Sequence, residues 1–162
     1  MPVLIRTARA ADADDVARLT GHLGYDVAPA DVEASLSRIL ARTDQQFLVA
    51  EIDGRPVGWL HLGVVEYIET GPFAVINGLV VDSGCRGQGI GRLLLEWAEE
   101  WSTRQGVSIV RLWSTTSRER AHRFYERLGY TKIKTQYSFA KSVGANRQQD
   151  FTALIPRVDP EP

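Results

Sequence analysis

A glycine-rich turn between an apolar strand and an amphipathic helix is the feature that most constrains this chain. Residues 74–81 read as a buried strand, and residues 90–101 carry apolar side chains at helical spacing. A helix start leaves its first backbone N–H groups unpaired, and its dipole attracts negative charge. Because the glycines of residues 84–91 leave these groups accessible, the sequence predicts a phosphate or pyrophosphate site there.

Two familiar phosphate-binding loops do not fit this turn. A Walker A loop requires a lysine directly after its second glycine, but Ile90 follows Gly89. The dinucleotide fingerprint requires a third glycine where this chain has Arg92. We therefore expect neither a nucleoside triphosphatase nor a dinucleotide-binding enzyme.

The pattern that fits is Arg-x-x-Gly-x-Gly over residues 86–91. It resembles the acetyl-CoA loop of the GCN5-related N-acetyltransferases (GNAT), in which glycines let the backbone approach the CoA pyrophosphate. The resemblance implies direct acetyl transfer within a ternary complex, with a backbone N–H of Val80 or Val81 polarising the thioester carbonyl. The residues it implies for acetyl-CoA binding on the strand and loop are Leu79, Val80, Val81, Arg86, Gly87, Gln88, Gly89, Ile90, Gly91 and Arg92.

A second block, residues 114–130, carries the same resemblance. It ends in Phe-Tyr-Glu-Arg-Leu-Gly-Tyr, as the corresponding GNAT helix does, and we expect Ser117 as its N-cap. The resemblance implies that Tyr125 binds the cofactor and acts as general acid toward the CoA thiolate. Ser117 and Arg118 complete the implied cofactor contacts, although Arg118 stands where many relatives carry an asparagine.

The fold class implied is α/β (α+β), with a mixed central sheet splayed at the acetyl-CoA strand. We expect roughly six to seven strands flanked by four helices. Pro29 begins the second helix, and Asp53-Gly54 predicts a hairpin. The strands are expected at residues 3–8, 46–52, 57–65, 74–81, 107–113, 132–134 and 137–143.

Composition describes an ordinary globular chain of 162 residues with net charge −1. This charge gives no sign of nucleic-acid or membrane binding, and one cysteine favours the cytoplasm. We expect a GNAT domain over residues 1–143 and a polar tail over residues 144–162. No metal-ligating residues are assigned.

The general base is harder to choose than the acid. Glu66, Glu69 and His61 are the titratable candidates near the end of the third strand, and we select Glu66. Asn77 cannot accept the proton, but it can orient the amine or a water molecule. Cys85 is read as non-catalytic because no histidine lies beside it in the sequence.

The function predicted is acetyl-CoA-dependent acetylation of a primary amine on a small molecule. A protein or peptide acceptor is one alternative, and a non-catalytic acyl-CoA sensor on the same fold is another. We expect the acceptor pocket around residues 24–26 and 66–69, whose acids and tyrosines suit a cationic amine. A homodimer is common among relatives.

Overall fold

Five strands form one sheet whose spatial order follows the chain order, β1 to β5. Strands β1 to β4 are antiparallel neighbours, and β5 runs parallel to β4. A parallel pair requires a crossover connection, which a helix between β4 and β5 supplies. The strands are β1 (Leu4–Thr7), β2 (Gln45–Ile52), β3 (Arg55–Tyr67), β4 (Gly71–Val81) and β5 (Val110–Leu112).

The computed structural model describes residues 2–143 and 151–156. The chain divides into two compact units, one up to Trp113 and one from Ser114 onward. The first holds the sheet with α1 (Ala13–Thr20), α2 (Pro29–Leu40) and α3 (Ile90–Arg104), and the second holds α4 (Glu119–Arg127). In the ranges described, no helix is long and apolar enough to cross a membrane.

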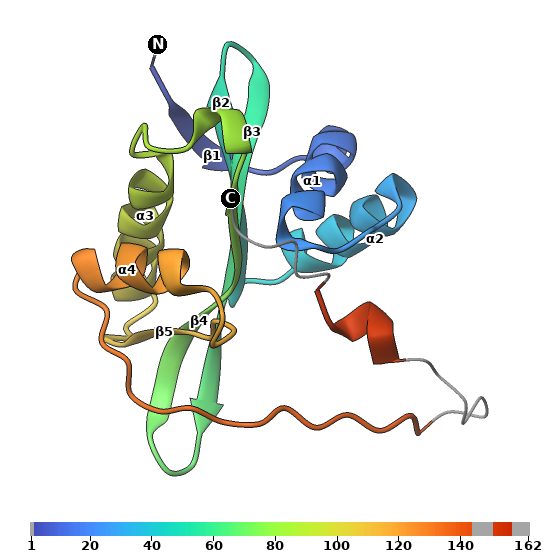
Figure 1. Cartoon of the computed structure of the whole chain (residues 1–162). Coiled ribbons are helices and arrows are strands. Elements are labelled where there is room, and N and C mark those ends of the chain that lie inside the picture. The colour runs from blue at the N-terminus through green and yellow to red at the C-terminus, as the bar shows by residue number, and fades with distance from the viewer. Residues whose placement is uncertain (1, 144–150, 157–162) are drawn as a thin grey trace. The chain divides into compact units, whose positions relative to one another are not determined.

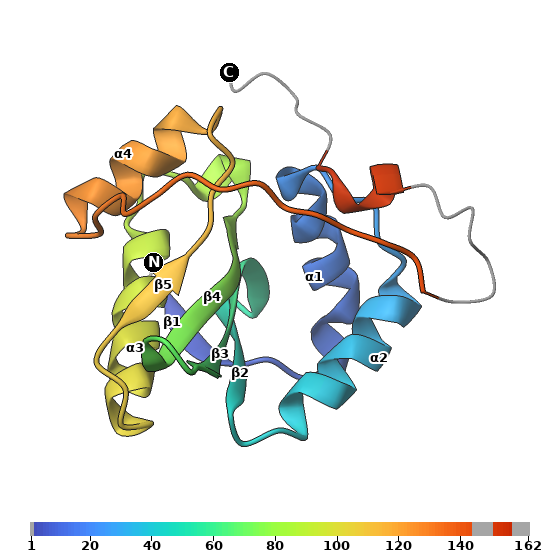
Figure 2. The same cartoon turned by 90° about the horizontal axis from the view of Figure 1, so that it is seen from below.

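Within the first unit, α1 and α2 cover one face of the sheet and α3 covers the other (Figure 1, Figure 2). The alternation of side chains along each strand supplies apolar groups to both faces. Phe47, Val49 and Trp59 pack with Val16 and Leu36 on the α1/α2 face. The middle parts of β2, β3 and β4 are therefore buried on both sides, in keeping with their apolar runs.

Local chemistry explains the ends of several elements. Asp53 and Gly54 both take positive φ values, 48° and 80°, as a two-residue hairpin turn needs. Pro29 is the first residue of α2, and Gly106, with φ of 79°, follows the end of α3. The predicted Asp53-Gly54 turn and the predicted helix start at Pro29 are confirmed.

The predicted sheet is too large. The structure has five strands, because residues 132–134 and 137–143 form no strand in the described part of the chain. Their side chains alternate as in a strand, but an extended segment without a ladder partner gains no strand hydrogen bonds. The predicted strand over residues 107–113 also shortens to β5, which is half-buried rather than buried.

An ion cluster joins β1, β2 and the turn before α1. The Arg6 guanidinium donates to both carboxylate oxygens of Asp12 at 2.9 Å and to Glu51 at 2.8 Å. Asp12 is only 7% exposed and also accepts the Arg9 backbone N–H at 2.7 Å. Burial alone would raise the pKa of the Asp12 carboxyl, but these hydrogen bonds outweigh burial and hold that pKa below its usual value.

We expect Asp12→Ala to lower the free energy of unfolding by about 2 kcal/mol at pH 7, measured by urea denaturation, because Arg6 loses a buried partner. The ionised carboxylate stabilises the fold fully above the unfolded-state pKa of about 3.9. That contribution disappears as the pH falls through the lower pKa of the folded state. Asp44→Ala breaks an exposed pair with Arg42, so it should cost much less, and equal losses would contradict this assignment.

Candidate functional site

A β-bulge interrupts the pairing of β3 with β4. His61 pairs with Gly78 and Leu62 pairs with Ile76, so Asn77 is the extra residue on β4. Beyond the bulge, the Asp82 N–H donates to the Val57 carbonyl at 2.8 Å. Since bonded and non-bonded pairs alternate in an antiparallel ladder, the backbone groups of Leu79 and Val81 point away from β3.

The parallel ladder between β4 and β5 stops at the bulge. Its last pair is Ile76 with Leu112. Leu79 and Val81 therefore direct N–H and C=O groups to an edge with no strand partner among the residues described. The strand that the sequence predicts to bind acetyl-CoA thus presents the free edge that such binding needs.

The free edge leads directly into an open loop and a helix start. Gly87 and Gly89 have φ values of 76° and 80°, and a Cβ on either would meet no atom within 4 Å. Gly89 is the N-cap of α3 and offers no side-chain hydrogen bond to the first turn. The first N–H groups of α3 are therefore available to an anion.

Side chains around the loop divide into two kinds. Ile90 is buried and anchors α3, whereas Arg86 and Gln88 are exposed. Arg92 is also exposed, but its Nε donates to Glu96 at 2.7 Å, and this ion pair partly neutralises the Arg92 charge. Gly91 lies in the first turn of α3 and keeps a negative φ.

An anchor missed by the sequence analysis holds the loop to the rest of the unit. Asp82 accepts the Gly84 N–H at 3.0 Å and the Arg18 guanidinium at 2.7 Å. Arg18 also donates to the Pro56 carbonyl at 3.0 Å and to Asp15. The Arg18 hydrogen bond lowers the pKa of the Asp82 carboxyl. An Asp-Ser-Gly turn is visible in the sequence, but its partner on α1 is 64 residues away.

The candidate bases lie at different distances along β3 from the bulge. His61 lies opposite Gly78, donates a hydrogen bond from Nε2 to Gln45 Oε1 at 2.8 Å, and stacks on Phe47. Burial lowers the pKa of His61, so its ring is neutral at pH 7. Glu66 is exposed and pairs with Pro72. It lies roughly 16 Å from His61 along β3. Glu69 is exposed in the hairpin turn.

The remaining predicted residues belong to the second unit. Tyr125 lies on α4 with its ring 5.2 Å from that of Phe124 and 5.9 Å from that of Tyr130. Burial raises the pKa of the Tyr125 phenol, with a smaller opposing effect of Arg118. The predicted N-cap was wrong by one residue: Arg118, not Ser117, caps α4, because Ser117 remains in the preceding turn.

Comparison with known proteins decides the family. Residues 14–130 match the model of the acetyltransferase (GNAT) family. This chain belongs to the GNAT family.

Three GNAT relatives illustrate the range of similarity. An uncharacterized N-acetyltransferase of Methanocaldococcus jannaschii is 35% identical over 94 residues, 57% of this chain and 42% of that protein. One of Chlorobaculum tepidum is 31% identical over 134 residues, 82% and 78% of the two chains. Aminoalkylphosphonate N-acetyltransferase of Salmonella typhimurium is 41% identical over 68 residues, 42% and 43%. The chain thus spans about half the length of several curated relatives it matches.

A solved structure confirms the GNAT fold. The aminoglycoside N-acetyltransferase AAC(6')-Iy, in complex with a bisubstrate analog of CoA, superposes with a TM-score of 0.79 at 16% identity. The superposition covers 88% of this chain and 99% of that one. In this GNAT chain, residues 79–81 and 86–92 both belong to the first unit, whereas Tyr125, Ser117 and Arg118 belong to the second.

Gly78 tests whether the bulge requires a residue without a side chain. A Cβ on Gly78 would lie 2.6 Å from Cη2 and Cζ3 of Trp59, so the indole must move. We expect Gly78→Ala to lower the free energy of unfolding by about 2 kcal/mol, measured by urea denaturation. Gly84→Ala is the control, because its Cβ would meet only Asp82 Oδ1 at 3.6 Å. Equal effects of the two substitutions would contradict this account.

Proposed function

We propose that this protein is an acetyl-CoA-dependent N-acetyltransferase that acts on a primary amine of a small molecule. The observation that carries the proposal is the continuous free edge and open helix start formed by Leu79, Val81 and residues 86–92. The backbone edge suits an extended amide chain such as pantetheine, and the start of α3 suits a pyrophosphate. Family membership supports acetyl-CoA as the co-substrate.

The reaction we propose is one direct transfer. The neutral amine attacks the thioester carbon, a C–N bond forms, and the C–S bond breaks as the amine loses a proton. The N–H of Leu79 or Val81 stabilises the negative charge that develops on the carbonyl oxygen, because neither points toward β3. Val80, named with Val81 as a donor candidate, instead pairs with Trp59 of β3.

Tyr125 protonates the departing CoA thiolate in this proposal. Burial holds the phenol pKa above its usual value of about 10, so the proton is present at neutral pH. Glu66 stays the predicted acceptor of the amine proton. His61, neutral and opposite the bulge, is the second candidate for that role.

A small-molecule acceptor is favoured over a protein or peptide by one relative named for aminoalkylphosphonates. A non-catalytic acyl-CoA sensor is the remaining alternative. A cytoplasmic location and a homodimer stay predictions, as does a GNAT domain ending at residue 143 before a polar tail; residues 144–150 and 157–162 lie outside the described residues.

The enzyme proposal is tested by mixing the purified protein with acetyl-CoA and a panel of amines, peptides and aminoglycosides. Release of CoA thiol that depends on one acceptor class supports it. Acetyl-CoA binding without thiol release across the panel would favour the sensor.

The loop is tested by Gly89→Val. We expect this side chain to block the approach of the pyrophosphate and to weaken acetyl-CoA binding at least twentyfold, about 1.8 kcal/mol by calorimetry. Gly106→Val is a matched control, because Gly106 has φ of 79° at the other end of α3 and equally open space. Both variants carry similar backbone strain. Equal acetyl-CoA affinities would show that the loop is not the pyrophosphate site.

The acid is tested by Tyr125→Phe, which removes only the phenolic oxygen. We expect kcat to fall at least tenfold while the acetyl-CoA Kd changes less than threefold, since the proton donor is lost and the ring remains. Tyr137→Phe, at an exposed position, is the control. An unchanged kcat would remove Tyr125 from the acid role.

A further inference from the structure

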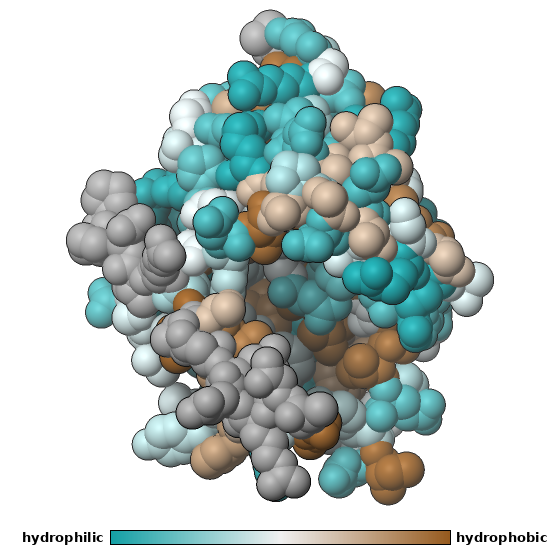
Figure 3. Space-filling model, turned by 90° about the vertical axis from the view of Figure 1, so that its right-hand side faces the viewer, coloured by the Kyte–Doolittle hydropathy of each residue, from teal (hydrophilic) through white to brown (hydrophobic). Residues whose placement is uncertain are grey.

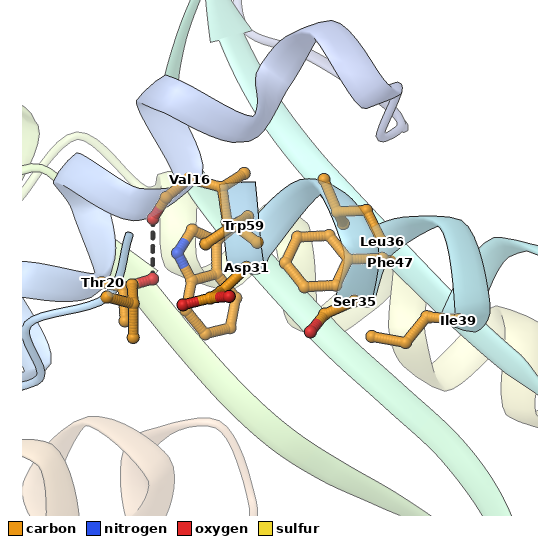
Figure 4. Close-up of a pocket in the computed structure, with 10 residues that line it drawn as sticks. Val16, Thr20, Asp31, Ser35, Leu36, Ile39, Phe47 and Trp59 are labelled. Atoms are coloured by element: carbon orange, nitrogen blue, oxygen red, sulfur yellow. Dashed lines mark hydrogen bonds between the residues drawn. The ribbon is translucent and has the colours of Figure 1, made fainter. Parts of the chain in front are cut away.

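A pocket on the α1/α2 face of the sheet has no role in cofactor binding as described above. It measures about 200 Å³ and is bounded by α1, α2, β2 and β3. The face of the molecule seen in Figure 3 shows hydrophobic residues gathered in a hollow between hydrophilic ones. Val16, Leu36, Ile39 and Phe47 are among the apolar residues that line it in the close-up of Figure 4.

Trp59 links this pocket to the β4 bulge. Its side chain lines the pocket, and its ring lies close enough to Gly78 that no Cβ fits between them. Gly78 directly precedes Leu79, whose backbone we assign to the thioester site. The pocket therefore adjoins the reacting end of the proposed cofactor site, on the sheet face that carries α1 and α2.

The indole N–H of Trp59 has no partner. Trp59 is 7% exposed, and its Nε1 is buried without a hydrogen bond in the described part of the chain. Figure 4 shows this nitrogen on the Thr20 side of the pocket, where the Thr20 hydroxyl already donates to the Val16 carbonyl at 2.7 Å. Because buried donors are nearly always paired, an oxygen or nitrogen atom that enters the pocket would complete this N–H.

Charge and size restrict that ligand further. Asp31 is the charged residue among those that line the pocket, and none of these lining residues is basic. A carboxylate there favours an ammonium group and repels a second carboxylate. A cavity of about 150 Å³ lined by Leu, Ile and Phe holds benzene, so this pocket holds one aromatic ring or one branched alkyl group.

We propose that the pocket selects the acceptor: a primary amine with one aromatic or branched apolar group, a neutral oxygen that accepts the Trp59 N–H, and no carboxylate. The inference rests on the proposed function, because it names the acceptor class of that same reaction. It also shifts the acceptor site from residues 24–26 and 66–69, expected from the sequence, to the α1/α2 face.

Matched acceptors test the proposal on the wild-type protein with acetyl-CoA. We expect kcat/KM for tyramine to exceed that for tyrosine, which adds only a carboxylate, at least tenfold. Tyramine should also exceed 2-phenylethylamine, which lacks only the hydroxyl, at least fivefold. Equal values within either pair would overturn the corresponding part of the proposal.

Variants assign these preferences to residues. Trp59→Phe should lower kcat/KM for tyramine at least fivefold more than for 2-phenylethylamine, because it removes the N–H and keeps a ring. Asp31→Asn should reduce the tyramine-to-tyrosine ratio at least threefold, whereas Asp14→Asn, at an exposed α1 position outside the pocket, should leave it unchanged. Unaltered ratios in both pocket variants would contradict the assignment.

A pocket-filling variant keeps the test independent of Trp59. Ser35→Phe places a ring in the pocket from α2, and we expect it to raise KM for tyramine at least fivefold; Ser37→Phe, exposed on the same helix, should not. Thiol release with polyamines or aminoglycosides alone would overturn this inference and leave the proposed function standing. Absence of acetyl-CoA binding by calorimetry would overturn both.

Discussion

One extra residue in β4 sets the geometry on which the rest of the site depends. The bulge at Asn77 changes which backbone groups of β4 face β3, and the ladder with β5 ends at the preceding residue, Ile76. As a result, Leu79 and Val81 offer hydrogen-bonding groups outward from a strand that is otherwise central in the sheet. Without the bulge, the alternation that points the Ala74 N–H to β5 would turn the groups of Leu79 and Val81 toward β3, where pairing would consume them. Gly78 completes the arrangement, since only glycine leaves room for Trp59.

A strand end that lacks one neighbour needs support from elsewhere. Arg18 provides it by joining α1 to Asp82, at the exit of β4, and to the Pro56 carbonyl at the start of β3. Asp82 in turn accepts the Gly84 N–H and fixes the first turn of the loop. The backbone of the glycines that follow can remain accessible, because the contacts of Asp82 with Arg18 and Gly84 hold the loop in place. Arg18 is thus a positioning residue for the loop that we propose to bind the cofactor.

The sequence was sufficient for features governed by local rules. The Asp53-Gly54 turn, the Pro29 helix start and the position of the glycine turn before α3 each depend on residues near in sequence, and each is confirmed. That the glycine turn binds a pyrophosphate stays a prediction. The bulge could not be predicted, because it is a difference in register between two strands and Asn77 alone carries no sign of it. The Arg18–Asp82 pair and the unpaired Trp59 N–H also depend on distant segments. The prediction of two further strands after α4 was wrong for the same reason. Alternation at Ile133, Tyr137 and Phe139 indicates an extended chain, but it does not supply a neighbouring strand to pair with.

Amide hydrogen exchange measured by NMR, with and without acetyl-CoA, tests the central claim most directly. In the free protein, the account predicts fast exchange at Leu79 and Val81 and slow exchange at Val80, whose N–H is paired with β3. Acetyl-CoA should then slow exchange at Leu79 or Val81 and in the first turn of α3, with Val80 unchanged. Protection of Leu79 and Val81 before acetyl-CoA is added, or no change at any of these amides when it binds, would contradict the account.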